Sequence, residues 1–193
     1  LMQLGQLVND PNISQEDKQK LFEQYVSNGE SIIMQVTNTN PKNSENWFQQ
    51  GNFYQNLDSF GVQNAKQLGI ISFQKALELS PRNPQTNLVL GNIFFSAAQA
   101  NLTQINKLEE AEDKDQTQID TLKTTQEQLI TKTEEYLLKA IELKGNFVPA
   151  LYLLGQFYEF KGDKNSALEA YSIVLQLVPD NQDVKARIEA LSK

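Results

Sequence analysis

The sequence "ALYLLGQFY" (residues 150–158) places a glycine in the middle of a strongly apolar run with helical spacing. The same arrangement occurs twice more, as "NWFQQGNFY" (46–54) and "NLVLGNIFF" (87–95). Glycine inside a helix costs about 1 kcal/mol relative to alanine, so a glycine at the same place in three runs indicates close packing. We therefore expect three helices, each of which approaches a neighbouring helix at its glycine.

A period of about 34 residues, with two helices in each unit, is typical of the tetratricopeptide repeat. The spacing from Gly51 to Gly91 exceeds this period by six, and the spacing from Gly91 to Gly155 exceeds it by thirty. In the third unit a "KGD" turn and a second apolar helical stripe follow Gly155, and Pro179 then closes the unit where such repeats have a proline. The chain therefore resembles the tetratricopeptide repeat family over about residues 43–193.

The resemblance implies an all-α solenoid of antiparallel helix pairs, in which small residues let the two helices of a pair approach closely. Near the N-terminus, apolar residues in helical phase follow a capping box formed by Ser14 and Asp17. We expect one helix there, about residues 15–38 and weakly interrupted at Gly29, with a short helix before it. The short helix would include Leu4, Leu7 and Val8.

The expected domain organisation has five parts, because solenoids stack similar units between atypical ends. The parts are N-terminal helices of a degenerate leading repeat (1–40), a first repeat with a short loop insertion (41–83), a second repeat with an extended helical hairpin at about 100–131 (84–147), a third repeat (148–181) and a C-terminal capping helix (182–193).

The thirty additional residues fall in the second unit, within a stretch that has no proline or glycine. Apolar residues recur there at steps of three and four, which is the pattern of a heptad seam. The seam includes Phe94, Ala98, Leu102 and Ile105 before the centre of the insertion, and Ile119, Leu122, Leu129 and Tyr136 after it. We therefore expect a coiled-coil hairpin of two helices that projects from the solenoid, with its tip near Lys114.

Residues 101–135 carry nine acidic and four basic residues, so most of the excess negative charge of the chain lies on this hairpin. Two interpretations remain open. The charged surface is simply solvated, or the hairpin is an arm that docks a partner or pairs with a second copy of the chain as a homo-oligomer.

The composition excludes several classes of function. The chain of 193 residues has a net charge of −7, which argues against nucleic acid and anionic lipid as partners. It has no cysteine and no histidine, which excludes disulfides, thiolate zinc sites, cysteine nucleophiles and histidine bases. No apolar run is long enough for a membrane helix, so we expect no direct membrane insertion by these residues. The sequence begins at Leu1, and we expect it to be part of a longer protein.

Carboxylates are the only abundant groups for acid–base chemistry. The densest group of them, from Glu109 to Asp115, falls on the expected hairpin tip, where no apolar pocket would raise a carboxyl pKa. The sequence also has no glycine loop for phosphate and no calcium-loop pattern. We therefore expect no enzymatic activity, no cofactor and no metal in this chain.

The resemblance implies that the first helix of each unit lines a concave surface that binds a protein or peptide. The expected partner-binding residues are Phe48, Asn52 and Gln55 in the first unit, Leu88, Asn92 and Phe95 in the second, and Tyr152, Gln156 and Glu159 in the third. Amide side chains can bond the backbone of an extended peptide while apolar side chains fill its pockets. The alternative is that the chain's own helices, including the terminal cap, cover these residues.

Two narrower families match the chain to different degrees. Repeats that clamp a chaperone's terminal carboxylate use lysine, arginine and asparagine across the groove. This chain has Phe48, Val89, Pro149 and Leu153 at the matching places and agrees only at Asn52, so that subfamily does not fit. The run "NWFQQGNFYQNLDSFGVQNAKQLGIISFQKALELSPRNP" is similar to the repeat tails of bacterial O-antigen ligase or polymerase-like proteins. That likeness implies a soluble part of a glycan-assembly protein, tethered to a bacterial inner membrane by segments outside this sequence; the compartment itself stays open.

Overall fold

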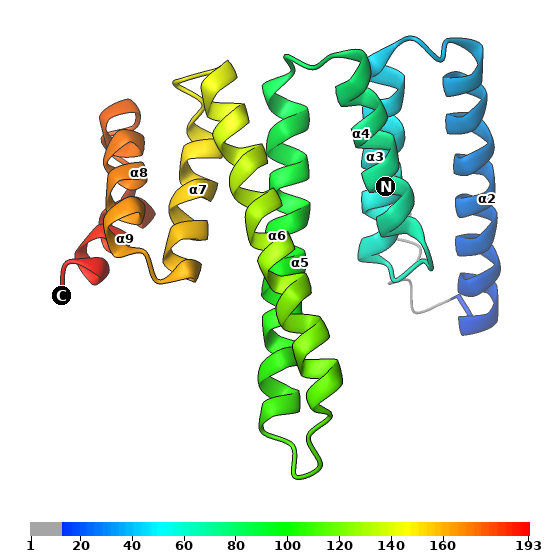
Figure 1. Cartoon of the computed structure of the whole chain (residues 1–193). Coiled ribbons are helices and arrows are strands. Elements are labelled where there is room, and N and C mark those ends of the chain that lie inside the picture. The colour runs from blue at the N-terminus through cyan, green and yellow to red at the C-terminus, as the bar shows by residue number, and fades with distance from the viewer. Residues whose placement is uncertain (1–12) are drawn as a thin grey trace. The chain divides into compact units, whose positions relative to one another are not determined.

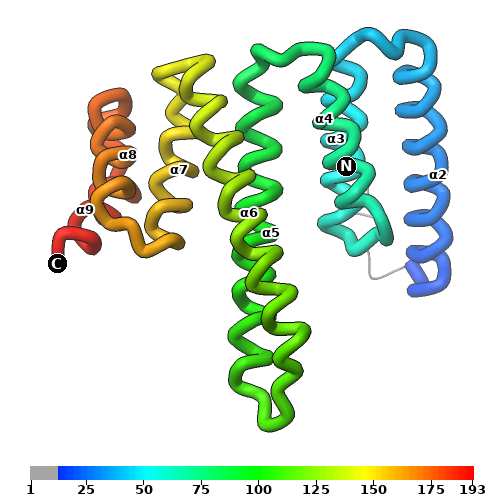
Figure 2. Tube along the Cα trace, in the orientation of Figure 1, coloured from blue at the N-terminus to red at the C-terminus, as the bar shows by residue number. Residues whose placement is uncertain are grey.

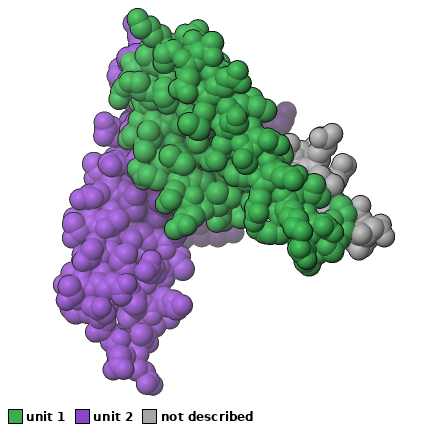
Figure 3. Space-filling model, turned by 90° about the vertical axis from the view of Figure 1, so that its right-hand side faces the viewer, with its two compact units in different colours: residues 1–80 green, residues 81–193 purple. Residues whose placement is uncertain are grey.

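The computed structural model describes residues 13–193, and within them every regular element is an α-helix (Figure 1). The helices are α2 (Gln15–Thr39), α3 (Ser44–Ser59), α4 (Ala65–Leu79), α5 (Pro84–Glu109), α6 (Gln116–Leu143), α7 (Val148–Lys161), α8 (Lys164–Leu177) and α9 (Gln182–Leu191). The chain divides into two compact units between Ser80 and Pro81, which Figure 3 colours separately. The short helix expected at Leu4, Leu7 and Val8 lies outside the described residues.

The first unit contains α2, α3 and α4, with α3 packed against both of the others (Figure 2). Ser14 caps the start of α2, because its hydroxyl oxygen accepts the backbone N–H of Asp17 at 3.1 Å; the same hydroxyl donates to Oδ2 of Asp17 at 2.6 Å. The helix then continues through Gly29 without a break. A Cβ atom at Gly29 would lie 2.5 Å from Cε2 of Phe53 on α3, so this glycine permits close packing. The expected interruption there is wrong.

The second unit contains α5 to α9. The paired helices are α5 with α6 and α7 with α8, and α7 also contacts α5 and α6 of the preceding pair. The last helix, α9, packs on α8 and buries Val184 completely. This is the arrangement of tetratricopeptide-repeat solenoids, in which each pair leans on the next.

The three glycines lie where the two helices of a pair meet, as expected. A Cβ atom at Gly51 would lie 2.6 Å from the Phe73 ring, and one at Gly91 would lie 2.7 Å from Cδ2 of Leu137. Gly155 faces the ring of Tyr171 in the same way. The separation in sequence between a glycine and its partner is shortest in the third pair, six longer in the first and thirty longer in the second. The additional residues are therefore insertions between equivalent contacts.

The thirty-residue insertion forms the expected hairpin, since α5 and α6 both extend past the usual turn and pack together along their length (Figure 1). The turn between Glu109 and Gln116 contains Lys114, as expected. The seam differs at one position. Asn101 is buried in place of Leu102, and its Nδ2 donates to the Leu122 carbonyl and to Oε1 of Gln126, both at 2.9 Å.

Four helices end on the same turn. Their C-caps share a φ between −137° and −148°, and the N-cap of the next helix follows three residues later. The C-caps are Asn40, Ser80, Lys144 and Val178, and the following N-caps are Asn43, Asn83, Phe147 and Asn181. The turn is the same each time, so α2 ends in the same way as α4, α6 and α8, the second helices of the three pairs.

Candidate functional site: a cleft between α5, α7 and α9

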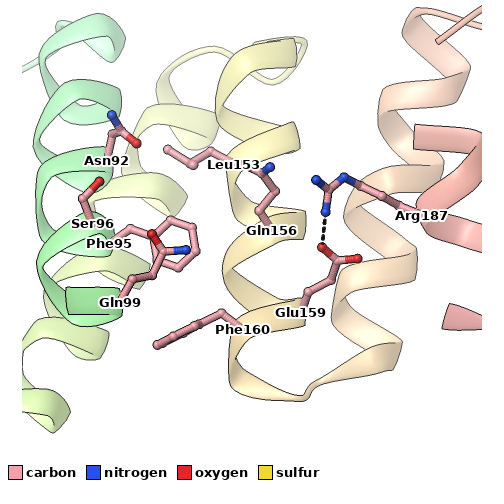
Figure 4. Close-up of a pocket in the computed structure, with 9 residues that line it drawn as sticks. All are labelled: Asn92, Phe95, Ser96, Gln99, Leu153, Gln156, Glu159, Phe160 and Arg187. Atoms are coloured by element: carbon pink, nitrogen blue, oxygen red, sulfur yellow. Dashed lines mark hydrogen bonds and ion pairs between the residues drawn. The ribbon is translucent and has the colours of Figure 1, made fainter. Parts of the chain in front are cut away.

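A cleft of about 550 Å³ opens in the second unit between helices of successive repeats (Figure 4). Its two long walls come from α5 and α7, and α9 contributes one side chain at the end of the cleft. The residues that line it are Asn92, Phe95, Ser96 and Gln99 from α5, Leu153, Gln156, Glu159 and Phe160 from α7, and Arg187 from α9.

The α5 wall is polar. Asn92, Ser96 and Gln99 follow one another at steps of four and three, so they share one face of the helix. All three are exposed, and within the described part of the chain no hydrogen bond engages their side chains. They are therefore free to bind a ligand.

Aromatic packing forms the apolar floor. Phe95 is only 4% exposed and meets Phe157 and Phe160 edge-on, with ring centroids 5.8 Å and 5.5 Å apart. This cluster joins α5, α6 and α7, because Leu137 of α6 and Leu154 of α7 belong to it as well. The floor is thus part of the core, and only Phe160 and Leu153 present a substantial apolar surface to the cleft.

An ion-pair network closes the end of the cleft at α9. Arg187 Nη1 lies 2.6 Å from Oε2 of Glu159, and its Nε lies 3.0 Å from Oδ2 of Asp183. The Tyr171 hydroxyl donates to Glu159 at 2.8 Å, and the Tyr152 hydroxyl donates to Asp183 at 2.6 Å. Three helices are therefore tied together at this point.

The network shifts the ionisation of its members. Burial, then the hydrogen bond to Glu159, raises the pKa of Tyr171, and burial with the Asp183 bond raises the pKa of Tyr152. Hydrogen bonds from Tyr152 and Arg187 lower the pKa of Asp183. Although burial lowers the pKa of Arg187, its bond to Asp183 and the nearby Glu159 raise it overall. All four groups therefore keep their ordinary charge near neutral pH.

Four of the nine residues expected from the sequence line this cleft. They are Asn92, Phe95, Gln156 and Glu159. Phe95 contributes to the floor rather than to an exposed face, and Glu159 is already paired with Arg187. Tyr152 lies next to the cleft, where its hydroxyl accepts from Nε2 of Gln156 at 3.2 Å. Leu88 is half-buried against the core that includes Phe147.

The other three expected residues lie on α3 in the first unit. Phe48 is half-buried and meets the Phe73 ring edge-on, with centroids 5.4 Å apart. Asn52 donates to the side chain of Gln49 at 3.4 Å, and Gln55 is half-buried. Their part in binding a partner stays a prediction.

Five lining residues were not expected. Ser96 and Gln99 continue the Asn92 face by one and two turns, so extending the helical pattern past one turn finds them. Leu153 and Phe160 flank Gln156 on α7 in the same way. Arg187 has no such signal, because its place depends on how α9 packs.

Two further features of residues 13–193 bear on function. No helix among them combines the length and apolar character needed to cross a membrane. No group of three acidic, histidine or cysteine side chains within this range could hold a metal ion. The cleft itself offers amides, a hydroxyl, apolar surface and one ion pair, which suit hydrogen bonding to another chain.

Comparison with known proteins gives a family for one segment and a fold for the whole. A tetratricopeptide repeat family model matches residues 148–181, which hold α7 and α8. Two crystal structures of MamA are similar, each with a TM-score of 0.61. One is 18% identical over 90% of this chain and 75% of the MamA chain, and the other 17% identical over 93% and 84%. A search of curated proteins finds no match.

Proposed function

Because residues 148–181 are a tetratricopeptide repeat and the chain has the fold of tetratricopeptide-repeat solenoids, we propose that it is a scaffold for protein–protein interaction. Repeats of this kind are generally non-catalytic. The scaffold binds an extended segment of a protein or peptide partner in the cleft between α5, α7 and α9.

The observation that carries this proposal is the row of unpaired polar side chains along α5. Asn92 and Gln99 each offer an amide donor and an amide acceptor, and Ser96 offers a hydroxyl. A peptide backbone presents alternating N–H and C=O groups, which such side chains can match in pairs. Gln156 on the opposite wall adds a third amide. The cleft therefore suits a peptide in an extended conformation, whose backbone N–H and C=O groups are not already hydrogen-bonded within a helix.

The apolar part of the cleft supports selection among peptides. Leu153 and Phe160 are both half-buried, so a ligand side chain placed between them would leave water without displacing the core. The ion pair of Glu159 and Arg187 contributes no net charge. We therefore expect partner segments with an apolar side chain next to an uncharged stretch of backbone.

The test is a comparison of two triple variants. The first changes Asn92, Gln99 and Gln156 to alanine, and the control changes Gln104, Asn106 and Gln128, which are exposed amides on the hairpin. Peptides selected from a displayed library by the unmodified chain are synthesised, and their Kd is measured by fluorescence anisotropy. Loss of two or three hydrogen bonds, each worth about 1 kcal/mol, should weaken binding at least tenfold in the first variant alone. Equal binding by both variants would contradict the proposal.

Two other hypotheses stay predictions. An appendage of a membrane-bound glycan ligase would be recognised by long apolar segments, each able to span a membrane, elsewhere in the full-length gene. A homo-oligomer formed through the hairpin would appear in light scattering as a mass that rises with concentration.

A further inference from the structure

The helices α2 and α3 of the first unit are joined in the same way as α6 and α7 of the second unit. The C-cap of α2 and the N-cap of α3 each lie 104 residues before those of α6 and α7. Gly51 of α3 and Gly155 of α7 have the same separation. Residues 15–57 therefore have counterparts at 119–161, and the two pairs of helices can be compared residue by residue.

In the second unit this pair of helices holds a lysine side chain. Lys161 Nζ lies 3.0 Å from Oε2 of Glu134. It also lies 5.3 Å and 5.4 Å from the ring centroids of Phe157 and Tyr158. The Tyr158 hydroxyl donates to the other carboxylate oxygen of Glu134 at 3.0 Å. One ammonium group is thus held by a carboxylate and two aromatic rings, both of which attract a cation.

The first unit has every part of this arrangement except the lysine. The counterparts of the carboxylate and the two rings are Glu30, Phe53 and Tyr54. The two rings meet edge-on with centroids 5.5 Å apart, and the Phe53 ring covers Gly29, the residue beside Glu30. Burial, then the charge of Glu30, raises the pKa of Tyr54, so the carboxylate lies near this side chain. The counterpart of the lysine is Leu57, which is buried beside Tyr54.

No cation pairs with Glu30 among residues 13–193. Glu30 is half-buried, and neither its carboxylate nor the Tyr54 hydroxyl forms a hydrogen bond or an ion pair within this range. Gln50 lies one turn before Tyr54 on the same face of α3, and its buried Oε1 also accepts no hydrogen bond there. Three side-chain oxygens therefore lack a partner, which favours a positively charged donor beside them.

We propose that Glu30, Phe53 and Tyr54 bind a lysine side chain of a partner protein, in the way that Lys161 is bound in the second unit. The ammonium group donates to the Glu30 carboxylate and lies beside the two rings. Residues 13–80 carry seven acidic and five basic residues, so the first unit attracts a basic partner. The site belongs to the first unit, whereas the cleft of the proposed scaffold belongs to the second.

Exposed apolar side chains near the site fit a polypeptide rather than a free amine. In the second unit Tyr158 lines a cleft of about 220 Å³ between α6, α7 and α8. Equivalent positions in α4 and α8 are counted from Phe73 and Tyr171, which meet the glycines. Three positions of that cleft have exposed apolar counterparts in the first unit, which are Met34, Leu68 and Ile71 at 50%, 37% and 49% exposure. A partner segment can cover them with an apolar residue next to its lysine.

The part of the chain that precedes residue 13 does not supply the cation, because residues 1–12 contain no lysine and no arginine. A first helix paired with α2 would also leave the site accessible. In the second unit α5 is the first helix paired with α6. The side chains of Lys161 and Glu134 are nevertheless 28% and 31% exposed there.

The test uses peptides with one lysine among random uncharged residues. They are selected from a displayed library by the chain in which Asn92, Gln99 and Gln156 are alanine, so that the cleft does not compete. The Kd of a selected peptide for the unmodified chain is then measured by fluorescence anisotropy. Replacing its lysine with norleucine, which keeps the apolar stem and removes the ammonium group, should weaken binding at least tenfold.

Two variants of the chain locate the lysine. Glu30→Gln should weaken binding of the lysine peptide at least tenfold and should bind the lysine and norleucine peptides equally. Glu23→Gln removes the same charge from an exposed position of the same helix and should bind normally. Equal affinity of the two peptides for the unmodified chain, equal affinity of the two variants, or a selection that enriches no peptide overturns the proposal.

Light scattering tests whether a second copy of the chain supplies the lysine. We expect the unmodified chain and Glu30→Gln to have the same mass at every concentration. A dimer that Glu30→Gln abolishes would mean that a lysine of a second copy occupies the site, and it would overturn the proposal of a different partner.

Discussion

The helices α2 and α8 end on the same turn, but they differ in how their apolar faces are covered. Val174 of α8 lies in a fully buried cluster with Tyr171 and with Val184 of the terminal helix α9. Val36, the equivalent residue of α2, is exposed. A short helix with one fully buried valine thus covers the apolar face of α8. Within residues 13–193 no helix covers the equivalent part of α2, so Val36 is exposed there.

The largest expected effect comes from a carboxylate in place of Val184, compared with the same change at Val36. Val184→Asp buries an unpaired carboxylate against Val174, and we expect it to lower the free energy of unfolding by about 3 kcal/mol or more. Val36→Asp should change it by less than about 0.5 kcal/mol, because the side chain meets water. Urea unfolding followed by circular dichroism measures both. Similar losses for the two variants would show that Val36 is covered.

A smaller effect is expected from alanine at two packing glycines. In Gly155→Ala the new methyl group meets the Tyr171 ring, which is fully buried and fixed by its bond to Glu159. Overpacking of this kind costs about 1–3 kcal/mol, against about 1 kcal/mol gained in helix propensity. In Gly29→Ala the half-buried Phe53 ring can turn away, so we expect a change within about 0.5 kcal/mol of zero. Thermal unfolding of both variants checks the difference, and an equally unstable Gly29→Ala would contradict the account.

The smallest effect is expected at high pH and belongs to the second unit. Burial, then the hydrogen bond to Glu134, raises the pKa of Tyr158 to about 12. The unfolded chain therefore loses this proton near pH 10 while the folded chain keeps it, so stability falls as the pH rises from about 10 to 12. Tyr158→Phe should make that part of the profile less steep, while Tyr171 and Tyr152, whose pKa values are also raised, still contribute to it. Urea midpoints measured between pH 8 and 12 test this; identical slopes for the two proteins would exclude the shift.

The repeat could be predicted from the sequence because its signals are local. The glycine, the apolar stripe around it and the turn after it lie within one helix or one turn of each other. The repeat spacing is lengthened by six residues in the first unit and by thirty in the second. This spacing indicated which helices pair, and the structure confirms those pairs. The hairpin was predictable for the same reason, since a heptad pattern describes two helices that face one another.

The candidate site was only partly predictable. Asn92 and Gln156 follow from their place on a first helix, but the burial of Phe95 depends on Phe157 and Phe160 from the next pair. Asn101 entered the hairpin seam in place of Leu102 because Leu122 and Gln126 offered acceptors across it. Leu122 and Gln126 are both more than twenty residues from Asn101 in the sequence.

The sequence by itself determined the helices, their pairing and the insertions, since each depends on side chains that repeat at a fixed spacing. Only the tertiary structure decided which faces are covered. Arg187 reaches Glu159 because α9 packs on α8, and Val36 stays exposed because the described chain offers α2 no first helix. The physical reason is that helical periodicity marks an apolar face, whereas its burial depends on whether another helix is present to cover it.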